Sequence, residues 1–130
     1  MKNYESSRQA VRRLLDRCAE ALTAEDCQYP ASVWDEHAVH LPPGAPALFG
    51  SETISEYLTR LAREGRWKVA VCTEDVRLAG ELAVAWGTFV ASVVPEGGGG
   101  TEYFDCKFLV LCRRQENGRW SILRSCYNSN

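Results

Sequence analysis

The chain has 130 residues, a length that suits one domain with a sizeable core. Hydrophobic residues make up 45% of it and charged residues 25%, which is ordinary for a globular protein. The formal net charge of −2 gives no reason to expect nucleic acid or an anionic membrane surface as a partner. We therefore expect a single domain over residues 1–130 that binds neither nucleic acid nor a membrane.

The first part of the chain has the residue pattern of a helix. Apolar residues recur at helical spacing from Val11 to Leu22, with charged residues on the opposite side, and predict an amphipathic first helix. A second, short helix is expected over about residues 29–35, with Pro30 near its start. A short strand should follow it and end at the turn-forming run Pro42-Pro43-Gly44.

A third helix is predicted after Gly50. Ser51 is a typical N-cap residue, and Gly65 is placed to close the helix. Its buried stripe contains Ile54, Leu58 and neighbours at helical spacing. The first half of the chain thus predicts three helices and a short strand segment.

The second half reads as strands joined by turns. Residues 67–72 alternate, and residues 82–94 and 102–114 form two longer runs. Turns are expected near Gly80, at the four glycines 97–100 and at Gly118, and residues 120–127 should close the sheet. The order of elements predicts an α+β domain with a mainly antiparallel sheet.

The long strands are apolar on both faces, which is unusual for a sheet with one wet face. Three helices can cover one face only. We therefore expect a homodimer through the outer face. The residues expected near that contact are Trp86, Val90, Phe108, Val110 and Trp120. A monomer with a thick core is the alternative.

Six cysteines could suggest a disulfide framework or a metal site, but their spacing matches neither. They are Cys18, Cys27, Cys72, Cys106, Cys112 and Cys126. Most fall within apolar patterns, so we expect reduced, buried thiols in a cytoplasmic protein with no metal. A nucleophilic thiol beside His37 or His40 is the alternative.

The run VWDEHAVHLPPGAPALFGSETISEYL, read with the closing GRWSILRSCYNSN, resembles the SnoaL-like and ketosteroid-isomerase-like branch of the nuclear transport factor 2-like superfamily. The resemblance covers nearly the whole chain. It implies a cone-shaped α+β fold in which three N-terminal helices pack on a curved sheet around a pocket. It also implies a small-molecule site that needs no cofactor.

Comparison with ketosteroid isomerase also suggests which residues line the pocket. The positions that it matches are Cys18, Trp34, Leu58, Phe89, Asp105 and Tyr127. Strand alternation adds His40 and Lys107, and Tyr103 is a further polar candidate for binding substrate. The isomerase chemistry itself is not expected, because Cys18 stands where that family has a tyrosine and Pro42 where it has its base.

His40 and Asp105 are the candidate catalytic pair. A histidine titrates near neutral pH, and a carboxylate beside it would fix its tautomer and raise its basicity. The opposing interpretations are a structural His40 and an ion pair between Asp105 and Lys107.

Two functions therefore remain open. The first is a cofactor-independent acid–base enzyme, such as an isomerase, cyclase, dehydratase or hydrolase, that acts on a small, largely apolar metabolite. The second is a non-catalytic module that binds a ligand or serves as a dimerising scaffold.

Overall fold

The computed structural model describes residues 4–23 and 30–130. Within them lie two α-helices, one short 3₁₀ helix and six strands, which we give in chain order. They are α1 (Tyr4–Thr23), η1 (Ala31–Val33), β1 (Trp34–Leu41), β2 (Leu48–Phe49), α2 (Ser51–Ala62), β3 (Gly65–Ala79), β4 (Leu82–Pro95), β5 (Glu102–Arg114) and β6 (Trp120–Ser129). Neither α-helix is long and apolar enough to cross a membrane.

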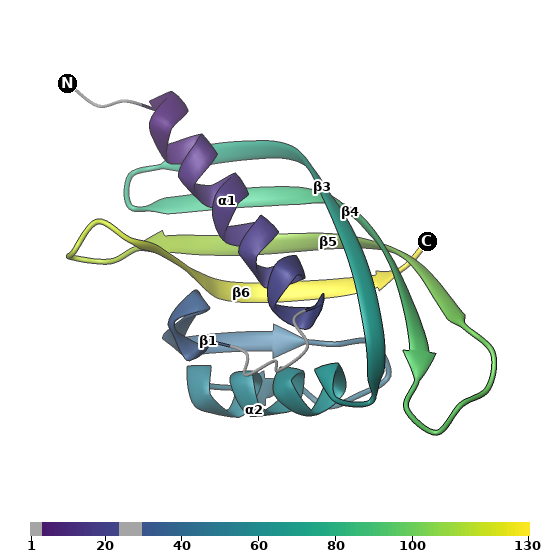
Figure 1. Ribbon diagram of the computed structural model, residues 1–130. Coiled ribbons are helices and arrows are strands. Elements are labelled where there is room, and N and C mark those ends of the chain that lie inside the picture. The colour runs from purple at the N-terminus through teal and green to yellow at the C-terminus, as the bar shows by residue number, and fades with distance from the viewer. Residues whose placement is uncertain (1–3, 24–29) are drawn as a thin grey trace.

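The six strands form one curved sheet in the order β2-β1-β6-β5-β4-β3. All neighbours are antiparallel except β1 and β6, which run parallel, so the sheet is mixed. Figure 1 shows α1 crossing one face of the sheet diagonally and α2 packed beside β1 on that same face. No element of the described chain covers the opposite face. The helix-covered face is called the inner face below, and the opposite one the outer face.

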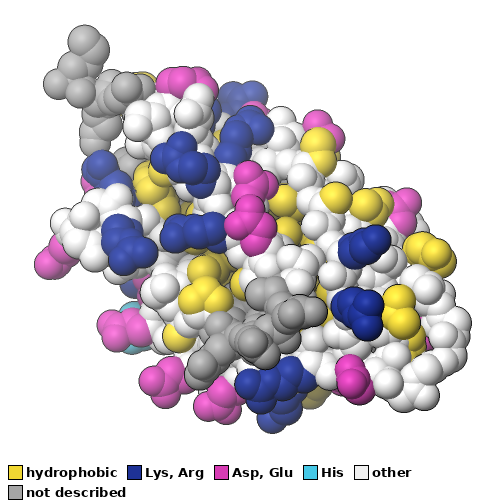
Figure 2. Space-filling model, in the orientation of Figure 1, with side chains coloured by type: hydrophobic (Ala, Val, Ile, Leu, Met, Phe, Trp, Pro, Cys, Tyr) yellow, Lys and Arg dark blue, Asp and Glu magenta, His cyan; other side chains and the backbone are white. Residues whose placement is uncertain are grey.

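The helices pack as their apolar spacing predicts. Val11, Leu14 and Leu15 of α1 are buried, and so are Ile54 and Leu58 of α2. On the polar side of α1, arginines reach the sheet: Arg8 Nε donates to the Val76 carbonyl (3.3 Å), and Arg12 Nη1 to the Thr73 carbonyl (2.9 Å). Figure 2 shows basic side chains gathered over the half of the molecule that holds α1.

The predicted second helix is corrected by the structure. Its described part is only the three-residue η1, whereas Trp34 and Asp35 already belong to β1. Strand pairing explains the difference, because Trp34 pairs with Ile122 of β6 and so draws the backbone into the sheet. Tyr29, at the expected start of this helix, lies outside the described residues. Two α-helices, not three, therefore pack on the sheet within the described chain.

Both expected ends of the last helix are also corrected. The N-cap is Gly50, at a φ of 91°, and Ser51 is the first helical residue. Gly65 does not close α2 but begins β3. A Cβ there would lie 2.4 Å from the Val94 carbonyl oxygen and 2.6 Å from a Val93 methyl group, so glycine allows β3 to start against β4.

The alternation of β4 and β5 decides which side chains meet the helices. Phe89 pairs with Cys106, and both face inward, whereas Val90 pairs with Asp105 on the outer face. The predicted dimer contact was therefore partly wrong, because Phe108 and Val110 belong to the inward set. Trp120 is likewise wrong for that contact, since it is buried in the core.

Candidate functional site

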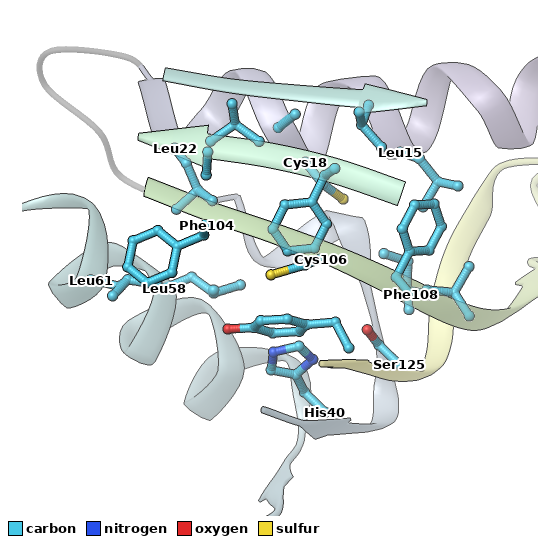
Figure 3. Close-up of a pocket in the computed structure, with 18 of the residues that line it drawn as sticks. Leu15, Cys18, Leu22, His40, Leu58, Leu61, Phe104, Cys106, Phe108 and Ser125 are labelled. Atoms are coloured by element: carbon cyan, nitrogen blue, oxygen red, sulfur yellow. The ribbon is translucent and has the colours of Figure 1, made fainter. Parts of the chain in front are cut away.

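A cavity of about 400 Å³ lies between the two α-helices and the inner face of the sheet. Both helices and every strand except β2 contribute to its wall, and most of the side chains are apolar. The lining residues are Leu15, Cys18, Ala19, Leu22, Trp34, His40, Pro43, Tyr57, Leu58, Leu61, Trp67, Val69, Val71, Phe89, Ala91, Phe104, Cys106, Phe108, Val110, Ile122, Ser125, Tyr127 and Ser129. Figure 3 shows residues of both helices and of β5 around this space, with His40 and Ser125 at one end.

Strand β1 sets the position of His40. The residue pairs with Leu48 of β2 on one side and with Ser125 of β6 on the other. The side chain points to the inner face and is only 4% exposed. The sheet therefore holds the imidazole at a fixed place in the cavity wall.

Aromatic rings surround the imidazole. The centroid of the Trp34 ring lies 5.1 Å away in an edge-on arrangement, and the Tyr127 ring stacks at 5.7 Å with an interplanar angle of 26°. Tyr57 is tilted at 6.5 Å. Aromatic neighbours exclude water from the ring without offering it a charge.

Neither ring nitrogen of His40 has a hydrogen-bond partner in the described chain, although both are buried. Buried polar atoms normally have one, since an unmet hydrogen bond costs about 1–3 kcal/mol. Burial also lowers the pKa of His40 to about 4, because the charged ring would lose its hydration. At neutral pH the site therefore presents an uncharged imidazole, with one donor and one acceptor both unused.

Tyr127 is the second polar group of the cavity with a strongly shifted pKa. Burial raises its pKa to about 12, and the nearby Tyr57 and Cys106 add to the effect. The phenol thus stays protonated at neutral pH. Its ring also meets the Phe89 ring edge-on at a centroid distance of 5.4 Å, so aromatic residues of β4 and β6 are in contact in the cavity wall.

The structure brings six of the nine predicted site residues together in the cavity wall. They are Cys18, Trp34, His40, Leu58, Phe89 and Tyr127. Tyr103, Asp105 and Lys107 do not line it. They belong to the outer set of β5, because in the register Asp105 faces the same side as the exposed Val90.

The outer-set residues have other contacts. Asn130 Nδ2 donates to Asp105 Oδ1 (2.8 Å), and Lys107 Nζ donates to the Ser129 carbonyl (2.8 Å). Tyr103 is 79% exposed. The sheet therefore separates Asp105 from His40. Lys107 binds the last residue of β6, and Asp105 binds Asn130, which follows it.

Sequence reasoning missed Tyr57, Phe104, Cys106 and Ser125 as cavity residues. The sequence of β5 does indicate which of its side chains face the cavity. Its set of alternate residues from Phe104 to Cys112 is entirely apolar, whereas the set from Tyr103 carries Asp105 and Lys107. In a two-layer domain the uniformly apolar set belongs under the helices.

The alternative of a nucleophilic thiol finds little support. Burial raises the pKa of Cys106, and the charge of Asp105 adds to it, so the thiol is not activated. His37 is exposed beside Glu36. Cys72, Cys106, Cys112 and Cys126 are free thiols, and Cys27 lies outside the described residues. Across residues 4–23 and 30–130, no three His, Cys, Asp or Glu side chains cluster closely enough to hold a metal ion.

Comparison with solved structures gives the same fold. An NTF2-like superfamily protein from Salmonella enterica serovar Typhimurium matches with a TM-score of 0.85 at 14% identity, covering 98% of this chain and 93% of that one. A ketosteroid isomerase-like protein from Erwinia carotovora atroseptica matches at 0.76 and 18% identity, covering 94% and 92%. A hexachlorocyclohexane dehydrochlorinase, LinA-type3, from Novosphingobium barchaimii matches at 0.81 and 14%, covering 98% and 88%.

At these identities the structural likeness shows the fold alone. No curated protein matches the sequence. The sequence profile of the SnoaL-like domain, however, matches residues 11–127, which is most of the chain. The chain therefore belongs to the SnoaL-like domain family, and its mixed six-stranded sheet with two covering helices is the fold of the nuclear transport factor 2-like protein above.

Proposed function

We propose that this domain binds a small, largely apolar molecule in the cavity between its helices and its sheet. The observation that carries the proposal is the buried imidazole of His40, which has no partner in the described chain and lines an otherwise almost wholly apolar space. A cavity of this size and character is typical of small-molecule sites. A core that served only to stabilise the fold would gain by filling the space and replacing the histidine.

A cavity-filling variant tests this proposal. Ala91 lines the cavity from β4, so Ala91→Leu should fill part of the space and weaken binding of naphthalene, used as an apolar probe, at least tenfold. Ala79→Leu adds the same side chain at an exposed position near the end of β3 and should leave binding unchanged. Titration calorimetry measures both. Undetectable binding of naphthalene by the unaltered protein would refute the proposal.

Acid–base catalysis by His40 is the second candidate function, favoured by the same unpartnered imidazole. The cavity offers no carboxylate partner among the described lining residues. The low pKa of His40 makes its ring a weak base. A neutral imidazole is better suited to polarise a substrate oxygen by donating a hydrogen bond. For a substrate turned over by the protein, His40→Ala should lower kcat about a hundredfold to ten-thousandfold. An unchanged kcat would leave ligand binding as the function.

The outer face supports the proposal that the domain is a homodimer. It exposes large apolar side chains on adjacent strands, with Trp86 49%, Val90 53% and Leu109 52% exposed. Trp86 and Leu109 are register partners, so they form a continuous patch. An apolar patch of this kind is typical of a protein interface.

A further inference from the structure

The walls of the cavity carry no formal charge. None of the described lining residues is Asp, Glu, Lys or Arg. An ion that entered would lose its hydration and meet no opposite charge in return, which is strongly unfavourable. Binding of a charged molecule is therefore unfavourable at every position within the cavity.

Titratable groups also face the cavity from several of the packed elements. They come from every packed element that has one: Cys18 from α1, Tyr57 from α2, His40 from β1, Cys106 from β5 and Tyr127 from β6. The residues that β3 and β4 contribute are not titratable. Burial lowers the pKa of His40 to about 4, raises that of Cys106 and raises that of Tyr127 to about 12.

The unused hydrogen bonds of His40 add a second constraint. A neutral imidazole has one bare nitrogen and one N–H, and either can face an incoming molecule. A hydroxyl group satisfies both cases, because it donates to the bare nitrogen or accepts from the N–H. A ketone or ether oxygen fits the N–H alone. Hydroxyl-type groups therefore match this site whichever tautomer is present.

The rings around His40 add a third constraint. Trp34 and Tyr127 lie within 6 Å of the imidazole centroid, and Phe89 meets Tyr127 edge-on. Trp67 of β3 and Phe104 of β5 also line the cavity, where their rings stack at a centroid distance of 5.9 Å and form another aromatic part of the wall. Aromatic walls favour flat, ring-shaped ligands, which can stack on them or meet them at their edges.

Resting on the proposed function, we propose that the cavity selects uncharged ring compounds that carry one hydroxyl-type group, and that it takes weak acids only in their protonated form. Three matched probes test this: naphthalene, 2-naphthol and naphthalene-2-sulfonate. Titration calorimetry with the unaltered protein should give about tenfold tighter binding for 2-naphthol than for naphthalene, the effect of one hydrogen bond. The sulfonate should not bind detectably.

A protonation series and two variants complete the experiment. The affinity of 2-naphthoic acid should fall about tenfold for each pH unit above the acid's own pKa, because only the neutral form enters. His40→Leu should bind 2-naphthol no more tightly than naphthalene, and His40→Gln, which retains a donor and an acceptor, should restore part of the difference.

The outcomes separate the two proposals. Failure of all the naphthalene probes to bind the unaltered protein would overturn the proposed function. Binding of naphthalene with no preference for 2-naphthol, or equal binding of the sulfonate, would overturn the selectivity alone. The comparison between probes needs only the unaltered protein, so it stands even if a His40 variant fails to fold.

Discussion

In the proposed function, the imidazole of His40 links ligand binding to stability. Its nitrogens are buried without a partner in the described chain, and this lowers the stability of the fold. A ligand that bonds to one of them removes part of that loss. The same residue makes the protein sensitive to acid, because the folded state resists protonating a ring that the unfolded chain protonates freely.

Stability should therefore fall as the pH drops from about 6.5 to about 4. In this window the unfolded chain binds a proton at His40 and the folded protein does not, so protonation favours unfolding. The shift of the pKa to about 4 corresponds to about 3 kcal/mol, lost in full below pH 4. Urea unfolding at a series of pH values measures it. His40→Leu should flatten the curve in this window, and an unchanged slope would contradict the assignment.

Asp35 is a second buried titratable group, and unlike His40 it has charged and polar partners. Burial by itself would raise the pKa of this carboxyl, but the backbone N–H of His37, the Gln115 amide and the Arg113 guanidinium outweigh burial and lower it. Arg113 Nη2 lies 2.7 Å from Asp35 Oδ2, and Gln115 Nε2 lies 2.8 Å from the same oxygen. The network joins the start of β1 to the β5–β6 hairpin.

Arg113→Met should destabilise the fold by about 1–3 kcal/mol, because the buried carboxylate loses a charged partner. Arg77→Met is the matched control. Arg77 pairs with Asp75 on the surface, with side chains 78% and 43% exposed, so the loss should stay below about 1 kcal/mol. Equal losses in chemical denaturation would show that the buried network has no special weight.

At the scale of the element, the shape of the cavity depends on how β3 bends over β4. The register between these strands shifts between Thr73 and Asp75, and a bulge of this kind bends a strand and increases its twist. Gly87 lies opposite Thr73 and leaves room there: a Cβ on it would lie 2.1 Å from the Cys72 carbonyl oxygen and 2.9 Å from Phe108 Cζ.

Gly87→Ala should therefore cost about 1–3 kcal/mol through overpacking. It should also weaken binding in the cavity, since Phe108 lines the wall and must move. Gly97→Ala, in the β4–β5 hairpin with no atom within 4 Å of the added Cβ, should change neither property. Thermal unfolding and naphthalene titration test the pair. A stable Gly87→Ala protein with normal binding would show that the strands adjust freely.

For the whole molecule, the sheet separates two apolar surfaces. Its inner face, with the helices, encloses the cavity, and its outer face presents the apolar patch around Trp86, Val90 and Leu109. Phe108 and Val110 belong to the first surface, so a partner bound to the outer face would not contact the cavity directly.

Trp86→Glu should convert the proposed homodimer into monomers, because burying the new carboxylate in an apolar contact is unfavourable. Phe49→Glu is the control, since Phe49 is 67% exposed on the short strand β2 at the sheet edge. It should leave the assembly unchanged. Light scattering at micromolar concentration gives the molar mass. A monomeric unaltered protein would refute the dimer.

The sequence by itself determined the order of most elements, because apolar spacing and turn residues are local signals. The strands from β3 to β6 and the buried stripes of α1 and α2 follow directly from the spacing of the apolar residues and from the turn residues between the segments. Local signals fail where a residue has a partner distant in the sequence. Pairing with β6 makes Trp34 and Asp35 part of a strand. Close approach to β4 explains why residue 65, at the start of β3, is a glycine.

The fold fixes which face of β5 meets the helices, although the uniformly apolar set from Phe104 to Cys112 already indicates it. Alternation groups Asp105 with Lys107 and Cys106 with Phe108, and only the difference in polarity between the two groups suggests which one points inward. That depends on the register with β4 and on the side where α1 and α2 lie, which are long-range choices made by burial of the whole apolar surface. His40 could thus be predicted as a cavity residue from the sequence. Its separation from Asp105 is indicated only by the polarity of β5 and is fixed by the register, because one residue of register moves a side chain to the other side of the sheet.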